Sequence, residues 1–279
     1  MFGRKKTGAV VCPSCGRLVG VSDKECLNCG RRNPGMWGLT GALRGLGRDA
    51  GFVQLVIGAS ILLYGAALFL DRGGVTSSGL SLLQPSPRSL VDLGASGAVP
   101  VFGFGRWWTF LSAGWLHAGL LHILFNMMWV RQLAPETAEL YGPGRMVIIY
   151  TIAGVTGFLL STLVGIFAPF LGGAQLTVGA SAPLFGLLAA LVYYGRRAGS
   201  RHIGSQAWTY AIILFAIGFF RFRGMRTDNW AHAGGFAGGY LVSRWLDPLI
   251  PEKGDHLIAA VVCLAATVLA IIASLLLGQ

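Results

Sequence analysis

Apolar residues are gathered along this chain in blocks that contain almost no charged side chains, and polar stretches separate the blocks. An α-helix needs about 20 consecutive apolar residues to cross a bilayer, so blocks of this length predict membrane-spanning helices. The pattern therefore predicts an all-α, polytopic membrane protein. We expect spans at approximately 52–70, 112–134, 146–170, 178–195, 206–220, 230–246 and 257–277.

The composition supports a protein that is integral to a lipid bilayer. Hydrophobic residues make up 54% of the chain and charged residues only 12%, whereas about 25% of residues are charged in soluble domains. The 42 glycines fit the same class, because small residues allow membrane helices to approach one another closely.

The basic residues predict the orientation of the spans. Most of the 22 lysines and arginines fall on one side if the polar tail before residue 52 lies in the cytoplasm, although the basic run at 221–226 does not. Cytoplasmic loops are enriched in these residues. We expect a cytoplasmic N-terminus and, because no transit peptide precedes the spans, a bacterial cytoplasmic membrane. The net charge of +11 then reflects topology and attraction to anionic lipids rather than nucleic-acid binding.

Two C-x2-C pairs in the tail predict a structural zinc site. Four thiolates brought to one point form a closed tetrahedral site, and glycines 16 and 30 would relax the turn after each pair. Disulfides or a redox pair are the alternatives, and a cytoplasmic location disfavours structural disulfides. The segment is too small to fold on a hydrophobic core, so metal would stabilise it. The four cysteines are Cys12, Cys15, Cys26 and Cys29.

These patterns divide the chain into four parts. We expect a cytoplasmic ribbon-like segment at 1–34, a glycine- and arginine-rich linker at 35–51, a helical core at 52–246, and a loop with a last span at 247–279. The ribbon could dock a cytoplasmic partner that the sequence does not identify. Cys263 lies in the last span and reads as a small buried apolar residue.

Few polar residues lie within the spans, and each is therefore a functional candidate. His122 and Asn126 are four residues apart and share one helix face. Ser181 begins the fourth span, and His232 lies near the start of the sixth. The second, fourth and sixth spans run in the same direction, so all four residues are expected at one depth, a little below the outer surface.

This set of residues predicts acyl-transfer chemistry. An imidazole can activate a serine as a nucleophile, and a tetrahedral oxyanion needs preorganised donors. Ser181 would be the nucleophile, His232 the base, and His122 and Asn126 the oxyanion donors, together with the backbone N–H of Ser181. Taken singly, a serine in "GASA" usually serves close helix packing, and a membrane histidine usually bonds to a neighbouring helix.

At these residues the chain resembles the rhomboid family of intramembrane serine proteases, over roughly residues 52–246. "HAGLLHILFN", "GASA" and "AHAGGFAGG" are similar to the three motifs of that family. The resemblance implies a six-helix core plus a seventh C-terminal transmembrane helix, and a Ser–His dyad that needs no cofactor. It assigns the oxyanion role to His122 and Asn126, and supporting roles to His117, Gly179, Phe185, Gly235 and Gly239.

The resemblance also implies how substrates are handled. They would be transmembrane segments of other proteins, cut near their outer end. The fifth span would be a lateral gate, and the loop at 221–229 a cap over the site.

Asp228 lies four residues before His232. It either reaches the imidazole or, as we expect, caps the sixth span.

The chain departs from the family pattern at a few positions. Ala182 stands where the family usually has glycine. The added methyl can crowd the fourth span or perturb the backbone of the nucleophile, and we expect one methyl to be tolerated. Phe185 replaces a frequent tyrosine. Of the family's Trp-Arg pair only Trp108 is in place, because Thr109 follows it and Arg106 lies upstream.

Three other functions are alternatives to the protease. The first is an inactive rhomboid-like protein that binds membrane clients, which the replacement at Ala182 keeps open. The second is a zinc-ribbon signalling protein with a membrane anchor, which would not need four such polar residues at one depth. The third is a transporter, which the lack of a carboxylate deep in a span disfavours.

Overall fold

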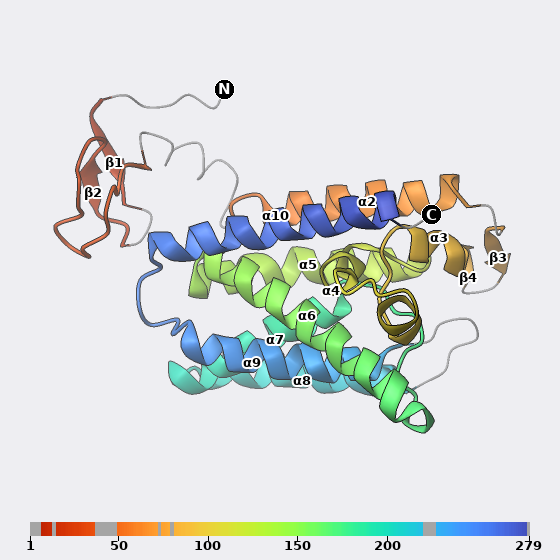
Figure 1. The fold of residues 1–279 in the computed structure, drawn as a ribbon. Coiled ribbons are helices and arrows are strands. Elements are labelled where there is room, and N and C mark those ends of the chain that lie inside the picture. Colours follow the sequence, from red (N-terminus) through yellow and green to blue (C-terminus); the bar gives the residue numbers. More distant parts are fainter. Residues whose placement is uncertain are drawn as a thin grey trace.

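The computed structural model describes residues 7–12, 15–36, 49–71, 74–78, 81–219 and 227–277. Its long helices run in broadly similar directions, and a small two-stranded sheet lies beyond one end of the bundle (Figure 1). Most of the expected linker, residues 37–48, lies outside the described residues. The same holds for residues 221–226 of the expected cap loop.

Each of the seven apolar stretches overlaps one long helix. Their bounds are α2 Phe52–Phe69, α5 Leu120–Tyr141, α6 Pro143–Phe167, α7 Ser181–Arg197, α8 Arg201–Ile217, α9 Asn229–Trp245 and α10 Gly254–Leu277. Within the described residues, α2, α6 and α10 are long and apolar enough to cross a membrane by themselves. The helices α7, α8 and α9 have 17 residues each, or about 25 Å at 1.5 Å per residue.

The second stretch differs from its expected bounds. A short helix α4, Thr109–Ser112, and a 3-10 turn η3, Ala113–Trp115, precede α5 and make an angle of 95° with it. The backbone is extended at Leu116 and at Gly119, so no helix continues through this corner. The helix proper therefore begins at Leu120 rather than near 112, and the corner places His117 inside the protein.

The region between α2 and α5 has structure that the hydropathy pattern did not predict. Two short strands pair antiparallel, β3 Thr76–Ser78 with β4 Ser81–Gln84. A helix α3, Pro87–Asp92, and a π-helical turn η2, Val99–Gly103, follow. Between α6 and α7 there is a 3-10 turn η4, Pro169–Leu171. These elements gather at the end of the bundle where α5, α7 and α9 begin (Figure 1).

The helix α7 forms the centre of the bundle. It packs against α5, α6, α8 and α9, and 12 of its 17 residues are buried. By contrast, Ala207 and Ala211 are the buried residues of α8. The central position of α7 surrounds its first residue, Ser181, with protein, whereas α8 lies at the periphery.

At the opposite end, Arg145 at the start of α6 ties down the connection between α9 and α10. Its guanidinium donates to the carbonyls of Leu246, Asp247 and Ile250. Its backbone N–H donates to the Glu252 carboxylate at 2.8 Å. Burial raises the pKa of Glu252, and the backbone N–H and charge of Arg145 oppose that shift. The loop after residue 246 is thus fixed to the core.

The N-terminal segment forms a small hairpin. Strand β1, Ala9–Val11, pairs antiparallel with β2, Leu18–Gly20, and Val10 lies opposite Val19. Among the described residues of this segment, the buried cluster consists of three valines and two cysteines: Val10, Val19, Val21, Cys12 and Cys26. So small a core supports the expectation that the segment depends on another source of stability.

Candidate active site and metal centre

Ser181 is the first residue of α7, so its backbone N–H belongs to the turn in which such groups have no partner within the helix. Gly179 precedes it with φ 129°, a left-handed conformation that side-chain-bearing residues rarely adopt. Pro183 follows within the first turn, where its missing N–H costs nothing. The local sequence therefore places a hydroxyl and free N–H groups together at the positive end of a buried helix.

His232 lies in the first turn of α9 and contacts Ser181 directly. Its Nε2 is 2.9 Å from the Ser181 hydroxyl oxygen. The imidazole is 5% exposed and stacks on the Phe185 ring, with centroids 4.2 Å apart and planes at 15°. The other ring nitrogen, Nδ1, is buried without a hydrogen-bond partner in the described part of the chain. The geometry is that of a serine–histidine pair with no third member among the described residues.

His122 and Asn126 lie beside this pair on α5. The Ala118 backbone N–H donates to His122 Nδ1 at 3.3 Å, so a neutral ring carries its proton on Nε2. A Cβ added at Gly179 would lie 2.7 Å from His122 Nε2 and 3.8 Å from Asn126 Nδ2. Asn126 Nδ2 donates one proton to the His122 carbonyl at 2.9 Å and keeps a second. Two side-chain donors therefore flank the backbone just before Ser181.

His117 occupies the corner before α5. It is 1% exposed, and its ring lies 5.2 Å from the ring of His122 at an angle of 65°. Among the described residues no hydrogen bond joins it to the Ser181–His232 pair, and its place next to His122 suits the structural role that the resemblance implied.

Gly235 and Gly239 bring α9 against α7. A Cβ at Gly235 would lie 2.2 Å from the Ala182 carbonyl oxygen, and one at Gly239 would lie 2.4 Å from the Gly186 Cα. Real side chains do not tolerate such contacts, so both positions need glycine. This close approach sets the distance between the helix that carries Ser181 and the helix that carries His232.

The methyl of Ala182, which we expected to be tolerated, fits against a glycine on α6. Ala182 is fully buried, and a Cβ added at Gly157 would lie 2.7 Å from the Ala182 Cβ. Gly157 thus leaves the room that the methyl occupies. Nearby, Gly154 accommodates Pro183, whose Cγ would be 3.2 Å from a Cβ at that position. The sequence signal for this fit is the glycine spacing of "AGVTG" at residues 153–157.

The residues around the incomplete Trp-Arg pair are also anchored. Trp108 donates to the Ser274 hydroxyl of α10 at 3.0 Å. Arg106 donates to the Val91 carbonyl at 3.1 Å, and the Thr109 hydroxyl donates to the Arg106 carbonyl at 2.7 Å. Trp108 therefore holds the loop before α5 to α10 and Arg106 holds it to α3, whereas Thr109 bonds back to the loop itself.

Asp228 caps α9 rather than reaching the imidazole. Its Oδ1 accepts the Ala231 N–H at 3.0 Å, and its Oδ2 accepts the Ser161 hydroxyl at 2.6 Å. The capping role is the one we expected from the sequence. Ser161, on α6, is a residue that the sequence analysis did not single out, because a serine inside an apolar stretch carries no local signal of a distant partner.

Asn229 links α9 to the end of α8. Its Nδ2 donates to the Phe215 carbonyl in the last turn of α8 at 3.3 Å, and this carbonyl also accepts the Gly218 backbone N–H at 3.2 Å. A Cβ at Gly218 would lie 2.0 Å from Asn229 Oδ1, so glycine is needed there. The Phe215 ring in turn lies 6.5 Å from the ring of Phe185.

At the other end of α8, Gly204 approaches Gly195 of α7. A Cβ added at Gly195 would lie 2.4 Å from the Gly204 Cα.

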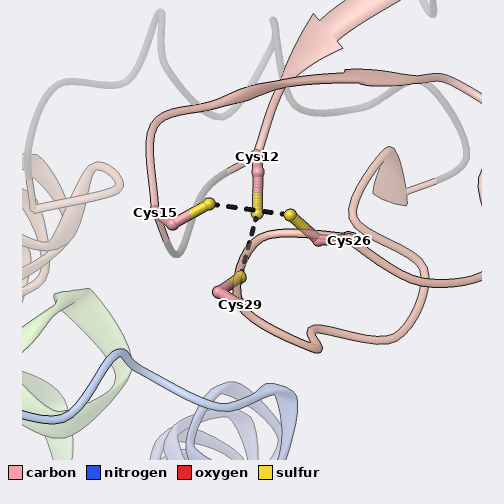
Figure 2. Close-up of side chains that lie close together, drawn as sticks. All are labelled: Cys12, Cys15, Cys26 and Cys29. Carbon is pink, nitrogen blue, oxygen red and sulfur yellow. Dashed lines mark hydrogen bonds between the residues drawn. The ribbon is translucent and has the colours of Figure 1, made fainter.

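The four cysteines of the N-terminal segment form a second cluster. Their sulfurs lie within 4.8 Å of one another, with Cys12 to Cys29 at 3.8 Å and Cys15 to Cys26 at 3.6 Å. Figure 2 shows the four side chains pointing toward a common centre. Tetrahedral zinc with bonds of about 2.3 Å requires sulfurs about 3.8 Å apart, so the cluster fits this metal.

The two C-x2-C turns have the same backbone geometry. The N–H of Gly16 donates to the Cys12 carbonyl, and that of Gly30 donates to the Cys26 carbonyl, at 3.0 and 2.9 Å. Both glycines have a positive φ, a conformation that glycine adopts without strain in a tight turn. The backbone N–H of Arg17 lowers the pKa of Cys15 to about 6, whereas burial raises the pKa of Cys29 to about 12. A bound cation would favour the thiolate at both positions.

The fold and the site together define a polytopic α-helical membrane protein with a buried serine–histidine pair at one end of its bundle. The Rhomboid domain profile matches residues 104–247, more than half of the 279 residues. The chain belongs to the rhomboid family. It is 31% identical over 221 residues to Rhomboid protease GluP of Bacillus subtilis, in a match that covers 78% of this chain and 39% of GluP.

Two further relatives show the range of the similarity. RHOMBOID-like protein 7 of Arabidopsis thaliana is 34% identical over 170 residues, 58% of this chain and 50% of the plant protein. Rhomboid-like protease 3 of Toxoplasma gondii is 27% identical over 222 residues, 78% of this chain and 77% of that protein. This chain thus matches half or less of the length of GluP and of the plant protein.

Proposed function

We propose that this chain is an intramembrane serine endopeptidase that uses Ser181 and His232 as a catalytic dyad. The observation that carries the proposal is the 2.9 Å contact between the Ser181 hydroxyl and His232 Nε2 at the buried start of α7. Stacking on Phe185 holds the imidazole in the orientation that this contact needs. Packing alone would not require a hydroxyl, an imidazole and two further donors to converge on one point.

In the acylation step, Ser181 Oγ attacks the scissile carbonyl carbon and passes its proton to His232 Nε2. The carbonyl oxygen becomes an oxyanion. When the C–N bond breaks, the imidazolium returns the proton to the amine that leaves. An acyl ester on Ser181 remains. Water then attacks the ester carbonyl, gives its proton to Nε2, and releases the carboxylic acid as Ser181 Oγ regains a proton.

The oxyanion would be stabilised by donors already in place. The His122 Nε2–H, the free proton of the Asn126 amide and the Ser181 backbone N–H all lie near the backbone of Gly179 and Ser181. Removal of one such donor typically costs 100- to 1,000-fold in rate, roughly. No cofactor is needed for these steps.

The proposed substrates are transmembrane segments of other membrane proteins, cut near their outer end. The peripheral position of α8 supports its role as the lateral gate. The close contact of Gly195 with Gly204 would be the pivot about which α8 moves. The hydrogen bond from Asn229 to the Phe215 carbonyl would hold the other end of α8 closed.

We also propose that the N-terminus lies in the cytoplasm of a bacterial cell. The start of α6 and the ends of α7 and α9 carry Arg145, Arg196, Arg197 and Arg244, all at the end of the bundle opposite to Ser181. By the positive-inside rule this end faces the cytoplasm. The cysteine cluster would then bind structural zinc in a reducing compartment and could dock a cytoplasmic partner.

Reconstituted protein tests the proposed activity. We expect purified wild-type protein in liposomes to cleave a generic transmembrane substrate, and Ser181→Ala and His232→Ala to abolish the cleavage. A fluorophosphonate should label wild-type protein at Ser181. Cys263→Ser serves as a matched control, because it alters a span residue on α10, away from the dyad.

The outcomes separate the protease from its alternative. Cleavage that persists in Ser181→Ala would refute the dyad. If wild-type protein neither cleaves nor reacts with the fluorophosphonate, the inactive, client-binding function becomes the better account of this chain.

A further inference from the structure

Ser161 lies at a junction of three elements close to the dyad. It is on α6, fully buried, and its hydroxyl donates to Asp228 Oδ2 at 2.6 Å. The Ser161 hydroxyl oxygen also accepts the Ala174 backbone N–H at 3.3 Å. A single hydroxyl thus joins α6 to the residue that caps α9 and to the segment that leads into α7.

One branch of this junction continues to His232. Asp228 accepts the Ala231 N–H through its side chain at 3.0 Å, and its carbonyl accepts the His232 N–H at 3.1 Å. The carboxylate therefore bonds to the first turn of α9, the turn that carries the imidazole. Displacement of Asp228 would move or fray that turn.

The other branch continues to Ser181. Residues 174–177 pair with residues 96–98 through backbone bonds, which include Thr177 N–H to the Ser96 carbonyl at 2.8 Å. Gly179 then donates to the Ala113 carbonyl at 3.0 Å, two residues before the nucleophile. The Ala174 bond to Ser161 ties the beginning of this segment to α6 and, through Asp228, to α9.

We propose that Ser161 is a positioning residue for the Ser181–His232 pair, because its hydroxyl fixes the first turn of α9 relative to the segment that precedes Ser181. This inference rests on the proposed protease function. Ser161 does not touch the reacting atoms. It acts through Asp228 and Ala174, and it limits the variation of the distance between Ser181 Oγ and His232 Nε2.

A purely local role for Ser161 would have different consequences. If its hydroxyl only stabilised α6, its loss would lower thermal stability without changing turnover. If Asp228 acted through its charge on His232, any neutral residue at 228 would be equally harmful. The positioning role instead predicts that geometry matters and that a neutral residue with the same hydrogen-bonding shape restores function.

The first test compares Ser161→Ala with Thr162→Val in liposomes. Thr162 is the next residue of α6, is fully buried, and its hydroxyl has no partner among the described residues, so its replacement removes a hydroxyl without breaking the junction. We expect kcat to fall about tenfold in Ser161→Ala with KM within about twofold, since small displacements of reacting groups carry costs of this order. Thr162→Val should match wild type.

Two further measurements keep the inference testable if Ser161→Ala folds poorly. In Asp228→Asn the side chain can still accept the Ala231 N–H, and its amide can donate to the Ser161 oxygen. We therefore expect turnover within about threefold of wild type. Asp228→Ala can do neither, and its turnover should fall by about tenfold or more. Hydrogen exchange at the amides of Ala174 and Ala231 should accelerate in Ser161→Ala and not in Thr162→Val.

The outcomes distinguish this inference from the proposed function. Wild-type protein that cleaves, beside a Ser161→Ala variant with unchanged kcat, would overturn the positioning role alone. Equal losses in Asp228→Asn and Asp228→Ala would overturn it as well and would point to the charge. Wild-type protein that neither cleaves nor reacts with a fluorophosphonate would overturn the protease and the positioning role together.

Discussion

The fit of Ala182 against Gly157 makes a prediction that the sequence alone would not make. From the family pattern, Ala182→Gly should relieve crowding and raise activity. The structure predicts the opposite, because the methyl fills space that Gly157 leaves open. Its removal leaves a void of methyl size, which costs about 1 kcal/mol, and adds a helical glycine, which costs up to about 1 kcal/mol. We expect a loss of about 1–2 kcal/mol in the free energy of unfolding.

Two assays check this prediction. Unfolding in mild detergent would measure stability, and the rate of fluorophosphonate labelling would measure the reactivity of Ser181, which we expect to be unchanged or lower. The opposite substitution, Gly157→Ala, serves as the companion variant. Its Cβ would lie 2.7 Å from the Ala182 Cβ and 2.6 Å from the Ala231 carbonyl oxygen, so three helices must separate and the loss should be larger, about 1–3 kcal/mol or more.

A specific result would refute the reasoning. If Ala182→Gly left stability unchanged and raised the labelling rate tenfold, the methyl would be a burden on the nucleophile, and the room at Gly157 would not relieve it. A Gly157→Ala variant as stable as wild type would show that α6, α7 and α9 are less tightly packed than their backbone distances indicate.

Two other predictions follow from the contacts around the site. Asn229→Ala removes the hydrogen bond to the Phe215 carbonyl, which contributes about 0.5–1.5 kcal/mol. Cleavage of a transmembrane substrate should therefore accelerate by up to about tenfold, while hydrolysis of a short soluble peptide stays the same. Equal effects on both substrates would argue against α8 as the gate. Cys26→Ser should lower the zinc content, measured by elemental analysis, from about one ion per chain to near zero. The thermal unfolding of the helical bundle should stay unchanged. An unchanged zinc content would refute the four-cysteine site.

Much of the fold was predictable because its signals are local. A run of apolar residues predicts a membrane helix wherever it lies, and each of the seven runs overlaps one long helix. Among the described helices, α2, α6 and α10 are long and apolar enough to cross a membrane by themselves. The two C-x2-C pairs, each followed by a glycine, predicted turns whose positive φ angles the structure shows at Gly16 and Gly30. The capping of α9 by Asp228 was predictable from its place just before the helix.

The sequence by itself determined which side chains are candidates for chemistry and, through the direction of the spans, that Ser181, His122 and His232 should lie near one end of the bundle. Only the tertiary structure decided the corner before Leu120, the accommodation of Ala182 by Gly157, and the junction at Ser161. The physical reason is that these features depend on contacts between helices. A serine or a glycine in an apolar run looks the same whether it faces lipid or another helix, and the partner that gives it a role lies tens of residues away.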